Sequence, residues 1–224
     1  MTHVMWMYGN HTDWDYTIET QFKTLEYMHE NFPESFEMLQ EQNQRGQLEL
    51  IVPQYGHGWH LPYPEKDFRE STNYTLTRMK EWGLSRSGII VLQEGHWMPA
   101  FGGVAEASDF TAFVAHREQL GYFDYYPEEP VLEWDFNGKK SYVMVVPRVP
   151  RMEGGYYHMN IYSADGELLN TGDVEVDVGP AKRFAFNEEK QKNHERHLEQ
   201  LEKKGVKFMR MDDFFQECVD NGDV

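Results

Sequence analysis

The sequence predicts an α/β protein built on a parallel sheet, and three observations lead to this class. Over the first 121 residues, short apolar runs typical of strands alternate with longer segments of helical periodicity. Parallel strands need long crossover connections, which helices usually supply, so this alternation favours a parallel sheet. From residue 131 to about 178 the sequence becomes rich in Val, Tyr and Trp, so we expect a β-rich insertion there.

The first half of the chain supplies three expected strands and four expected helices. The strands are expected at residues 3–9, 47–56 and 87–92. The helices are expected at residues 15–32, 33–46, 65–83 and 106–121. Pro33, Gly46 and Ser108 are typical of helix ends, as a first helical residue, a stop and an N-cap.

The second half of the chain has a different pattern. Asn137-Gly138 separates two strand-like runs and is a strong hairpin signal, and Asp165-Gly166 lies between two further runs of this kind. After these come a charged amphipathic helix, a short strand and a final helical turn or two, expected at residues 187–205, 206–211 and 212–219. The sequence contains no internal repeat or low-complexity linker, so residues 1–224 are expected to form a single domain.

The composition excludes several classes of partner. The formal net charge is −17 with no offsetting basic stripe, so nucleic acid and anionic membrane surfaces would be repelled. No apolar run approaches the roughly 18 residues of a membrane-spanning helix.

Cys218 is the only cysteine, which excludes an internal disulfide or a cysteine metal cluster. The first residues lack the pattern of a signal peptide, so the expected compartment is the cytoplasm.

Polar residues follow directly after the expected strand at 87–92. Glu94, His96 and Trp97 lie in the segment LQEGHWMPA, and a loop after a buried strand is where many folds keep their chemistry. Glu94 could be a functional carboxylate with Trp97 as a wall against a sugar ring. The alternative is that Glu94 caps a neighbouring helix and Trp97 packs in the core. Aromatic residues are 15% of the chain, which suits either an aromatic core or surfaces that stack on sugars or bases.

Residues 33 to 101 resemble glycoside hydrolase family 57. The resemblance rests on Gln47-Leu48-Glu49 in a strand, on the stretch Pro64 to Asp67, and on an L-x-E-x-x-W-x-P motif formed by Leu92, Glu94, Trp97 and Pro99. Family 57 belongs to a group of (β/α)7 barrels that also includes family 38 mannosidases and polysaccharide deacetylases. The resemblance therefore implies a (β/α)7-like barrel, complete or incomplete, with the β-rich insertion around residues 131–178.

The resemblance also implies a carbohydrate substrate and a pair of catalytic carboxylates. By position, Glu94 is similar to the catalytic nucleophile of the family, and SADGELLNTG is the nearest match to its acid/base motif, which nominates Asp165. An ordinary hairpin turn is the alternative explanation of Asp165-Gly166. The candidate substrate-binding residues are Glu49, His57, Trp59, His96 and Trp97. For Glu49 the alternative is a structural carboxylate.

A metal site is the second enzymatic possibility. His11-x-Asp13 resembles the pair that binds zinc in family 38 mannosidases, and His60 is a third candidate ligand. The two-carboxylate mechanism itself needs no cofactor. Three functions therefore stay open. They are a hydrolase or glycosyl transferase that uses a two-carboxylate retaining mechanism, a metal-dependent deacetylase or mannosidase-like hydrolase, and a shortened barrel that binds a saccharide or a protein without turnover.

Overall fold

The computed structural model describes residues 2–56, 64–91, 98–101, 103, 108–146, 156–162, 168–175 and 188–222. The elements, in chain order, are α1 (Thr2–Asn10), β1 (Tyr16–Glu19), α2 (Phe22–Asn31), α3 (Pro33–Gln44), β2 (Leu48–Ile51), α4 (Glu65–Glu81), β3 (Ile89–Val91), β4 (Ala112–His116), α6 (Arg117–Gly121), β5 (Val131–Phe136), β6 (Lys139–Val146), β7 (Tyr156–Tyr162), β8 (Leu168–Glu175), α7 (Glu188–Lys203) and α8 (Met211–Asn221).

The described strands form three sheets, and no closed barrel is found among them. β1 pairs with β2 in parallel. The second sheet has the order β3-β4-β6-β5, in which β3, β4 and β6 are parallel neighbours and β5 is antiparallel to β6. β7 and β8 form a separate antiparallel pair. The backbone N–H of Ser87 donates to the Leu50 carbonyl at 2.7 Å, so the chain enters β3 beside β2. The molecule is therefore an α/β protein with mixed sheets.

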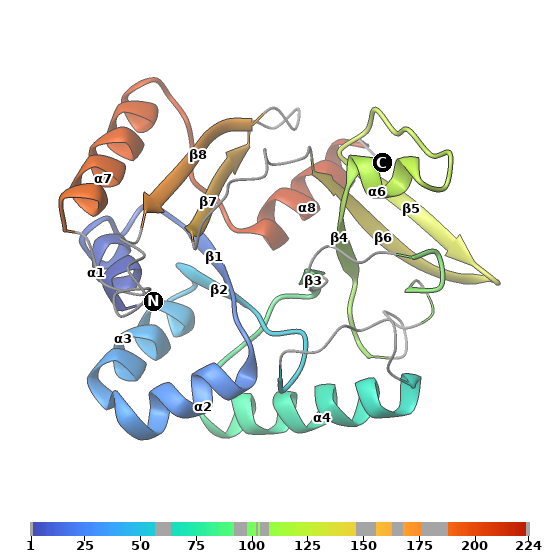
Figure 1. Cartoon of the computed structure of the whole chain (residues 1–224), viewed down its shortest axis with the longest axis horizontal. Helices are drawn as coiled ribbons and strands as arrows, with labels where there is room; N and C mark the ends of the chain where they lie inside the picture. The colour runs from blue at the N-terminus through green and yellow to red at the C-terminus, as the bar shows by residue number, and fades with distance from the viewer. Residues whose placement is uncertain are drawn as a thin grey trace.

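Strand β2 is buried on both of its faces, as expected of a parallel strand. Leu48 and Leu50 face the helices and join a core with Phe22 and Leu25 of α2 and Leu39 of α3. Because side chains alternate along a strand, Glu49 and Ile51 face the opposite side, which we call the inner face. Ile51 belongs to a different apolar cluster, built around α8. Figure 1 shows α8 between the β1–β2 pair and strands β4 and β6.

Helix α8 covers the inner face of the strands. Its Phe215 and Cys218 are buried in one cluster with Ile51 and with residues from the second sheet, namely Ile89, Ala112, Val114, Val131 and Met144. The other face of the second sheet packs in a separate cluster that includes Phe113 of β4, Val143 of β6 and Phe68 of α4. The second sheet is thus a middle layer, with α8 on one side and α4 on the other.

Several predicted elements are confirmed by the structure. β2, β3, α3, α4 and α7 match the expected segments at 47–56, 87–92, 33–46, 65–83 and 187–205. The insertion is β-rich as predicted, with β5 to β8 in the described part of residues 131–178. Asn137 and Gly138 have φ angles of 55° and 80°, the left-handed conformation required at both central positions of a type I′ turn. The final helix is α8, and it is longer than expected.

Four expectations are wrong. Residues 3–9 belong to helix α1 instead of a strand, and residues 206–210 form no strand. The expected helix at 15–32 is strand β1 followed by α2, and the one at 106–121 contains β4 followed by α6. The physical reason at β4 is burial on both faces. Phe113 and Ala115 pack toward α4 while Ala112 and Val114 pack toward α8, so the run is apolar throughout and lacks the alternation that marks a half-buried strand.

Candidate functional site

Most sequence-predicted site residues lie outside the described residues. His57, Trp59 and His60 fall in residues 57–63, Glu94, His96 and Trp97 in 92–97, and Asp165 in 163–167. The flanking elements are described. β3 ends at Val91, directly before the segment with Glu94, and residues 163–167 connect the antiparallel strands β7 and β8. The roles of Glu94 and Asp165 therefore stay predictions. In the sequence, Glu94 follows the parallel strand β3 and Asp165 lies between β7 and β8.

His11 and Asp13 do not follow a strand, because the segment before them is helix α1. The expectation that they lie at the carboxyl end of a first strand is therefore wrong. The His11 ring stacks on Trp14 with 3.7 Å between ring centroids, and its Nε2 lies 2.9 Å from Oε1 of Glu195 in α7. The side chain of Asp13 is exposed. Among the described residues, no group of three or more His, Cys, Asp and Glu side chains is placed to hold a metal ion. The metal site with His60 remains untested.

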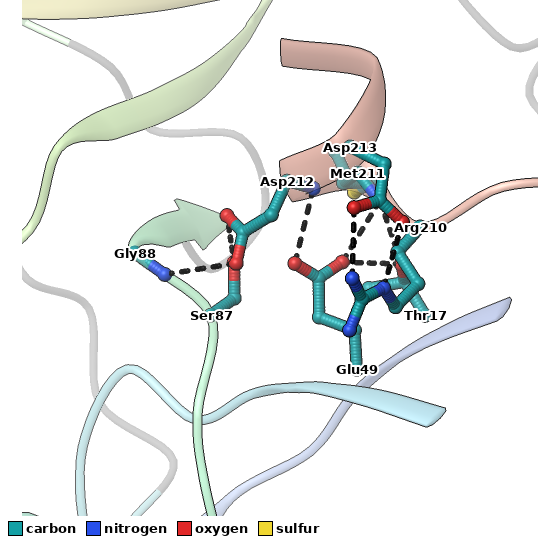
Figure 2. Close-up of polar contacts among 8 residues, drawn as sticks. All are labelled: Thr17, Glu49, Ser87, Gly88, Arg210, Met211, Asp212 and Asp213. Atoms are coloured by element: carbon teal, nitrogen blue, oxygen red, sulfur yellow. Dashed lines mark hydrogen bonds and ion pairs between the residues drawn. The ribbon is translucent and has the colours of Figure 1, made fainter. Parts of the chain in front are cut away.

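Glu49 holds the start of helix α8 (Figure 2). Its Oε1 accepts the backbone N–H of Asp212 at 3.0 Å, and its Oε2 accepts that of Met211 at 2.9 Å. Oε2 also accepts the hydroxyl of Thr17 from β1 at 2.5 Å. The first N–H groups of a helix have no partner within the helix, and a carboxylate satisfies them and interacts favourably with the helix dipole. Arg210, the N-cap residue, makes no such side-chain cap, so Glu49 supplies it from β2.

The environment of Glu49 opposes its charge. Glu49 is only 5% exposed, and this burial raises the pKa of Glu49 to about 7. The neighbouring Asp212 carboxylate acts in the same direction, while the hydroxyls of Thr17 and Ser87 act to lower the pKa. Both oxygens of Glu49 are occupied by α8 and β1, which favours the structural role over the substrate-binding role that the sequence also suggested. Substrate binding by Glu49 stays a prediction that the structure does not test.

Two further acidic residues in the first turn of α8 have separate partners. Asp212 accepts the Ser87 hydroxyl at 2.8 Å and the Gly88 backbone N–H at 3.4 Å, which ties α8 to the entry of β3. Asp213 accepts two hydrogen bonds from Arg210, at 2.8 and 2.7 Å. The Arg210 guanidinium lowers the pKa of Asp213 below its usual range. Figure 2 shows these contacts together with those of Glu49, so β1, β2 and the entry of β3 all meet the N-terminus of α8.

Glu19 is a candidate that sequence reasoning missed. It is the last residue of β1, and the alternation of a strand places it on the same side as Thr17, which contacts Glu49 on the inner face. The side chain is exposed to solvent, yet burial of the carboxyl among protein atoms raises the pKa of Glu19 above its ordinary value. A carboxyl that solvent reaches and whose protonated form is favoured can serve as a general acid.

The reason that Glu19 was missed is the assignment of residues 15–32 to one helix. The alternation in Tyr16, Ile18 and Thr20 is short, and it is followed without a break by helical spacing from Phe22. Only Thr20 and Gln21 lie between the last residue of β1, Glu19, and the first residue of α2, Phe22. The partners of Glu49 were hidden for another reason, because Met211 and Asp212 lie more than 160 residues away in sequence.

Comparison with solved structures finds a similar fold in larger enzymes. The structure matches 4-alpha-glucanotransferase from Thermococcus litoralis with a TM-score of 0.59 and 16% identity, over 64% of this chain and 23% of that one. It matches an alpha-mannosidase from Enterococcus faecalis V583 with a TM-score of 0.52 and 15% identity, over 64% of this chain and 16% of that one. The chain thus spans less than a quarter of either enzyme.

These comparisons establish a glycoside hydrolase-like fold and nothing finer, because the sequence identities are low. The sequence matches no family model and none of the curated proteins compared with it. In the described part of the chain, no helix is both long enough and apolar enough to cross a membrane.

Proposed function

We propose that the protein acts on a glycan by a two-carboxylate retaining mechanism, as a hydrolase or a glycosyl transferase. The observation that carries the proposal is the fold, which is similar to part of a glucanotransferase and part of a mannosidase. The position of Glu94 supports it, because β3 is a parallel strand that ends at Val91, and catalytic residues of β/α barrels follow the carboxyl ends of strands. The resemblance to family 57 gives Glu94 the role of nucleophile.

In this mechanism Glu94 attacks the anomeric carbon while an acid protonates the departing glycosidic oxygen. A covalent glycosyl-enzyme forms, and the same acid group then acts as a base for the incoming water or sugar hydroxyl. Water as the acceptor gives hydrolysis, and a sugar hydroxyl gives transfer. The two carboxyl groups must lie about 5 Å apart across the scissile bond. Trp97 and His96, beside Glu94 in sequence, are proposed to contact the sugar, with His57 and Trp59 from the segment after β2.

The acid/base has two candidates. Asp165 is the one implied by the resemblance, and it lies between β7 and β8. Glu19 is favoured by a specific observation, because it ends a parallel strand on the inner face and its pKa is raised by desolvation. A raised pKa keeps a carboxyl protonated closer to neutral pH, as a general acid requires. We therefore propose that one of these two residues donates the proton.

The nucleophile is tested with aryl glucosides and aryl mannosides, which report turnover directly. Glu94→Gln should lower kcat/KM by about a thousandfold or more and leave the melting temperature unchanged, since it keeps the size and removes the nucleophilic charge. Glu94→Ala should regain turnover with added azide, which attacks the anomeric carbon and yields a glycosyl azide. Glu37→Gln, an exposed carboxylate on α3, is the matched control and should retain the parent activity.

The acid/base is tested by varying the leaving group. When the true acid is changed to its amide, the variant should lose activity on substrates with poor leaving groups. It should keep the first step on 2,4-dinitrophenyl glycosides, because their leaving group departs without a proton. Asp165→Asn and Glu19→Gln are compared on both substrate classes, and the variant that loses activity only on the poor leaving groups identifies the acid. If the parent turns over no glycoside or glycan, the enzymatic proposal fails and the non-catalytic saccharide binder replaces it. Equal activity in the parent and Glu94→Gln removes Glu94 as the nucleophile.

A further inference from the structure

Four aromatic side chains are exposed together directly after α6. In the segment YFDYY at residues 122–126, which we call the aromatic loop, the exposed fractions are 86% for Tyr122, 48% for Phe123, 41% for Tyr125 and 72% for Tyr126. Single exposed aromatics are common on protein surfaces, but four within five consecutive residues form a patch of the kind that marks a binding surface.

The aromatic loop is fixed by hydrogen bonds to α6. The backbone N–H groups of Phe123 and Tyr125 both donate to the carbonyl of Leu120, at 2.9 and 3.2 Å, and Leu120 is fully buried. Asp124, between them, has a φ of 57° and donates its N–H to the Gly121 carbonyl at 3.1 Å. The Tyr125 ring meets Trp134 of β5 edge to face, with 5.7 Å between centroids. A ligand would therefore meet rings whose backbone is already ordered, which lowers the entropic cost of binding.

The position of the aromatic loop relates it to the proposed active site. β4 runs parallel to β3, with Val114 opposite Val91, so both strands leave the sheet at the same edge. The segment with Glu94 follows β3, and α6 with the aromatic loop follows β4. Figure 1 shows α6 and the loop after it beyond the end of β4. A chain-like ligand with one sugar at Glu94 could extend along this edge toward the aromatic loop.

We propose that the aromatic loop binds a neutral oligosaccharide, as a platform for sugar units beyond the one that reacts. This rests on the proposed function for the identity of the chain that is bound. The negative π-face of a Tyr or Phe ring attracts the C–H groups on the apolar face of a sugar. The carboxylates of Asp124, Glu128 and Glu129 are exposed around the rings and can accept hydrogen bonds from sugar hydroxyls. The same carboxylates repel uronic acids, sulfated glycans and nucleic acids.

A second copy of the chain fits this surface less well. A symmetric interface would bring Asp124, Glu128 and Glu129 against their own copies, and like charges across an interface are costly. The exposed side chains of the aromatic loop are tyrosines, one phenylalanine and one aspartate, without the exposed aliphatic residues that an apolar interface core would add. Self-association is therefore an outcome to test and is not the proposal.

The test measures oligosaccharide binding by calorimetry, with maltoheptaose and mannohexaose as neutral probes. Tyr122→Ala should weaken binding of the preferred probe by about two- to tenfold, which is the contribution expected of one ring contact. The double variant Tyr122→Ala with Tyr126→Ala should weaken binding by the product of two such factors. Tyr126→Phe keeps the ring and should bind like the parent. Tyr27→Ala is the matched control, since Tyr27 is 59% exposed on α2 and should not affect binding.

The outcomes separate this proposal from the proposed function. Binding that depends on Tyr122 and Tyr126 supports the platform even if no glycoside is turned over, and the catalytic proposal alone then fails. The opposite result is also possible. If the protein turns over aryl glycosides, but the parent, Tyr122→Ala and Tyr27→Ala bind the oligosaccharide equally well, the platform is overturned and the catalytic proposal stands. No binding of either probe by the parent also overturns it. Sedimentation of the parent and Tyr122→Ala that shows a dimer only for the parent would assign the rings to self-association instead.

Discussion

Glu49→Gln tests whether the buried carboxylate at the start of α8 controls stability near neutral pH. Burial raises the pKa of Glu49 to about 7 from an ordinary value of 4.5. The folded state therefore holds this proton more tightly than the unfolded chain does. At about 1.36 kcal/mol for each pH unit between the two values, the linked free energy is about 3 kcal/mol.

The sign of the effect follows from the two protonation states. Below about pH 4.5 the Glu49 carboxyl is protonated in both states, so its contribution to stability is fully present. Between that pH and about 7 only the unfolded chain releases the proton, so the free energy of unfolding falls. Above the folded pKa both states are ionised and the fall ends. Between about pH 4.5 and pH 7 the parent should therefore lose up to about 3 kcal/mol through this group, and Glu49→Gln should lack this loss.

The measurement is urea unfolding followed by tryptophan fluorescence, at several pH values and constant ionic strength. The difference between parent and Glu49→Gln isolates the carboxyl, because all other titrating groups are present in both proteins. Glu37→Gln on the exposed side of α3 is the control and should keep the parental pH dependence. An unchanged slope in Glu49→Gln would refute the reasoning, since the buried carboxyl would then bind its proton equally well in both states.

Three further predictions concern the fold and the cofactor. Gln47→Ala should lower the free energy of unfolding by about 1–3 kcal/mol in urea, because the buried amide donates to the carbonyls of Tyr8, His11 and Trp14; no change would show that these bonds are dispensable. Gly138→Ala should cost about 1 kcal/mol in the same assay, because φ is 80° there, and a stability equal to the parent's would contradict the turn assignment. Dialysis against EDTA should leave glycan turnover unchanged, whereas a loss restored by zinc would support the metal-dependent alternative.

The sequence predicts elements well where local chemistry alone decides them. Asn137-Gly138 requires left-handed backbone at two successive positions, and few turns other than a type I′ hairpin use this conformation. Pro33 begins α3 in the same local way. Strand β4 could not be predicted from local chemistry. Its assignment depends on which elements cover Phe113 and Val114, and these elements, α4 and α8, come from distant parts of the chain.

The candidate site shows the same division. The family resemblance directs attention to Glu94, which stays a prediction because residues 92–97 lie outside the described residues. The role of Glu49 could not be chosen from sequence, because its hydrogen-bond donors include Met211 and Asp212. Glu19 was hidden by a four-residue strand, since β1 is too short for its alternation to compete with the longer helical pattern beside it.

The capping of α8 by Glu49 has a consequence for the order in which the protein assembles. Glu49 and its helix partners are separated by 162 and 163 positions along the chain. During synthesis, β2 leaves the ribosome about 160 residues before α8, so Ile51 and Ile89 on the inner face lack Phe215 and Cys218 of α8 until that helix has emerged. Contacts of such long sequence separation slow folding, and exposed apolar strands favour aggregation in the meantime. Chaperone dependence during expression should therefore depend on when α8 emerges.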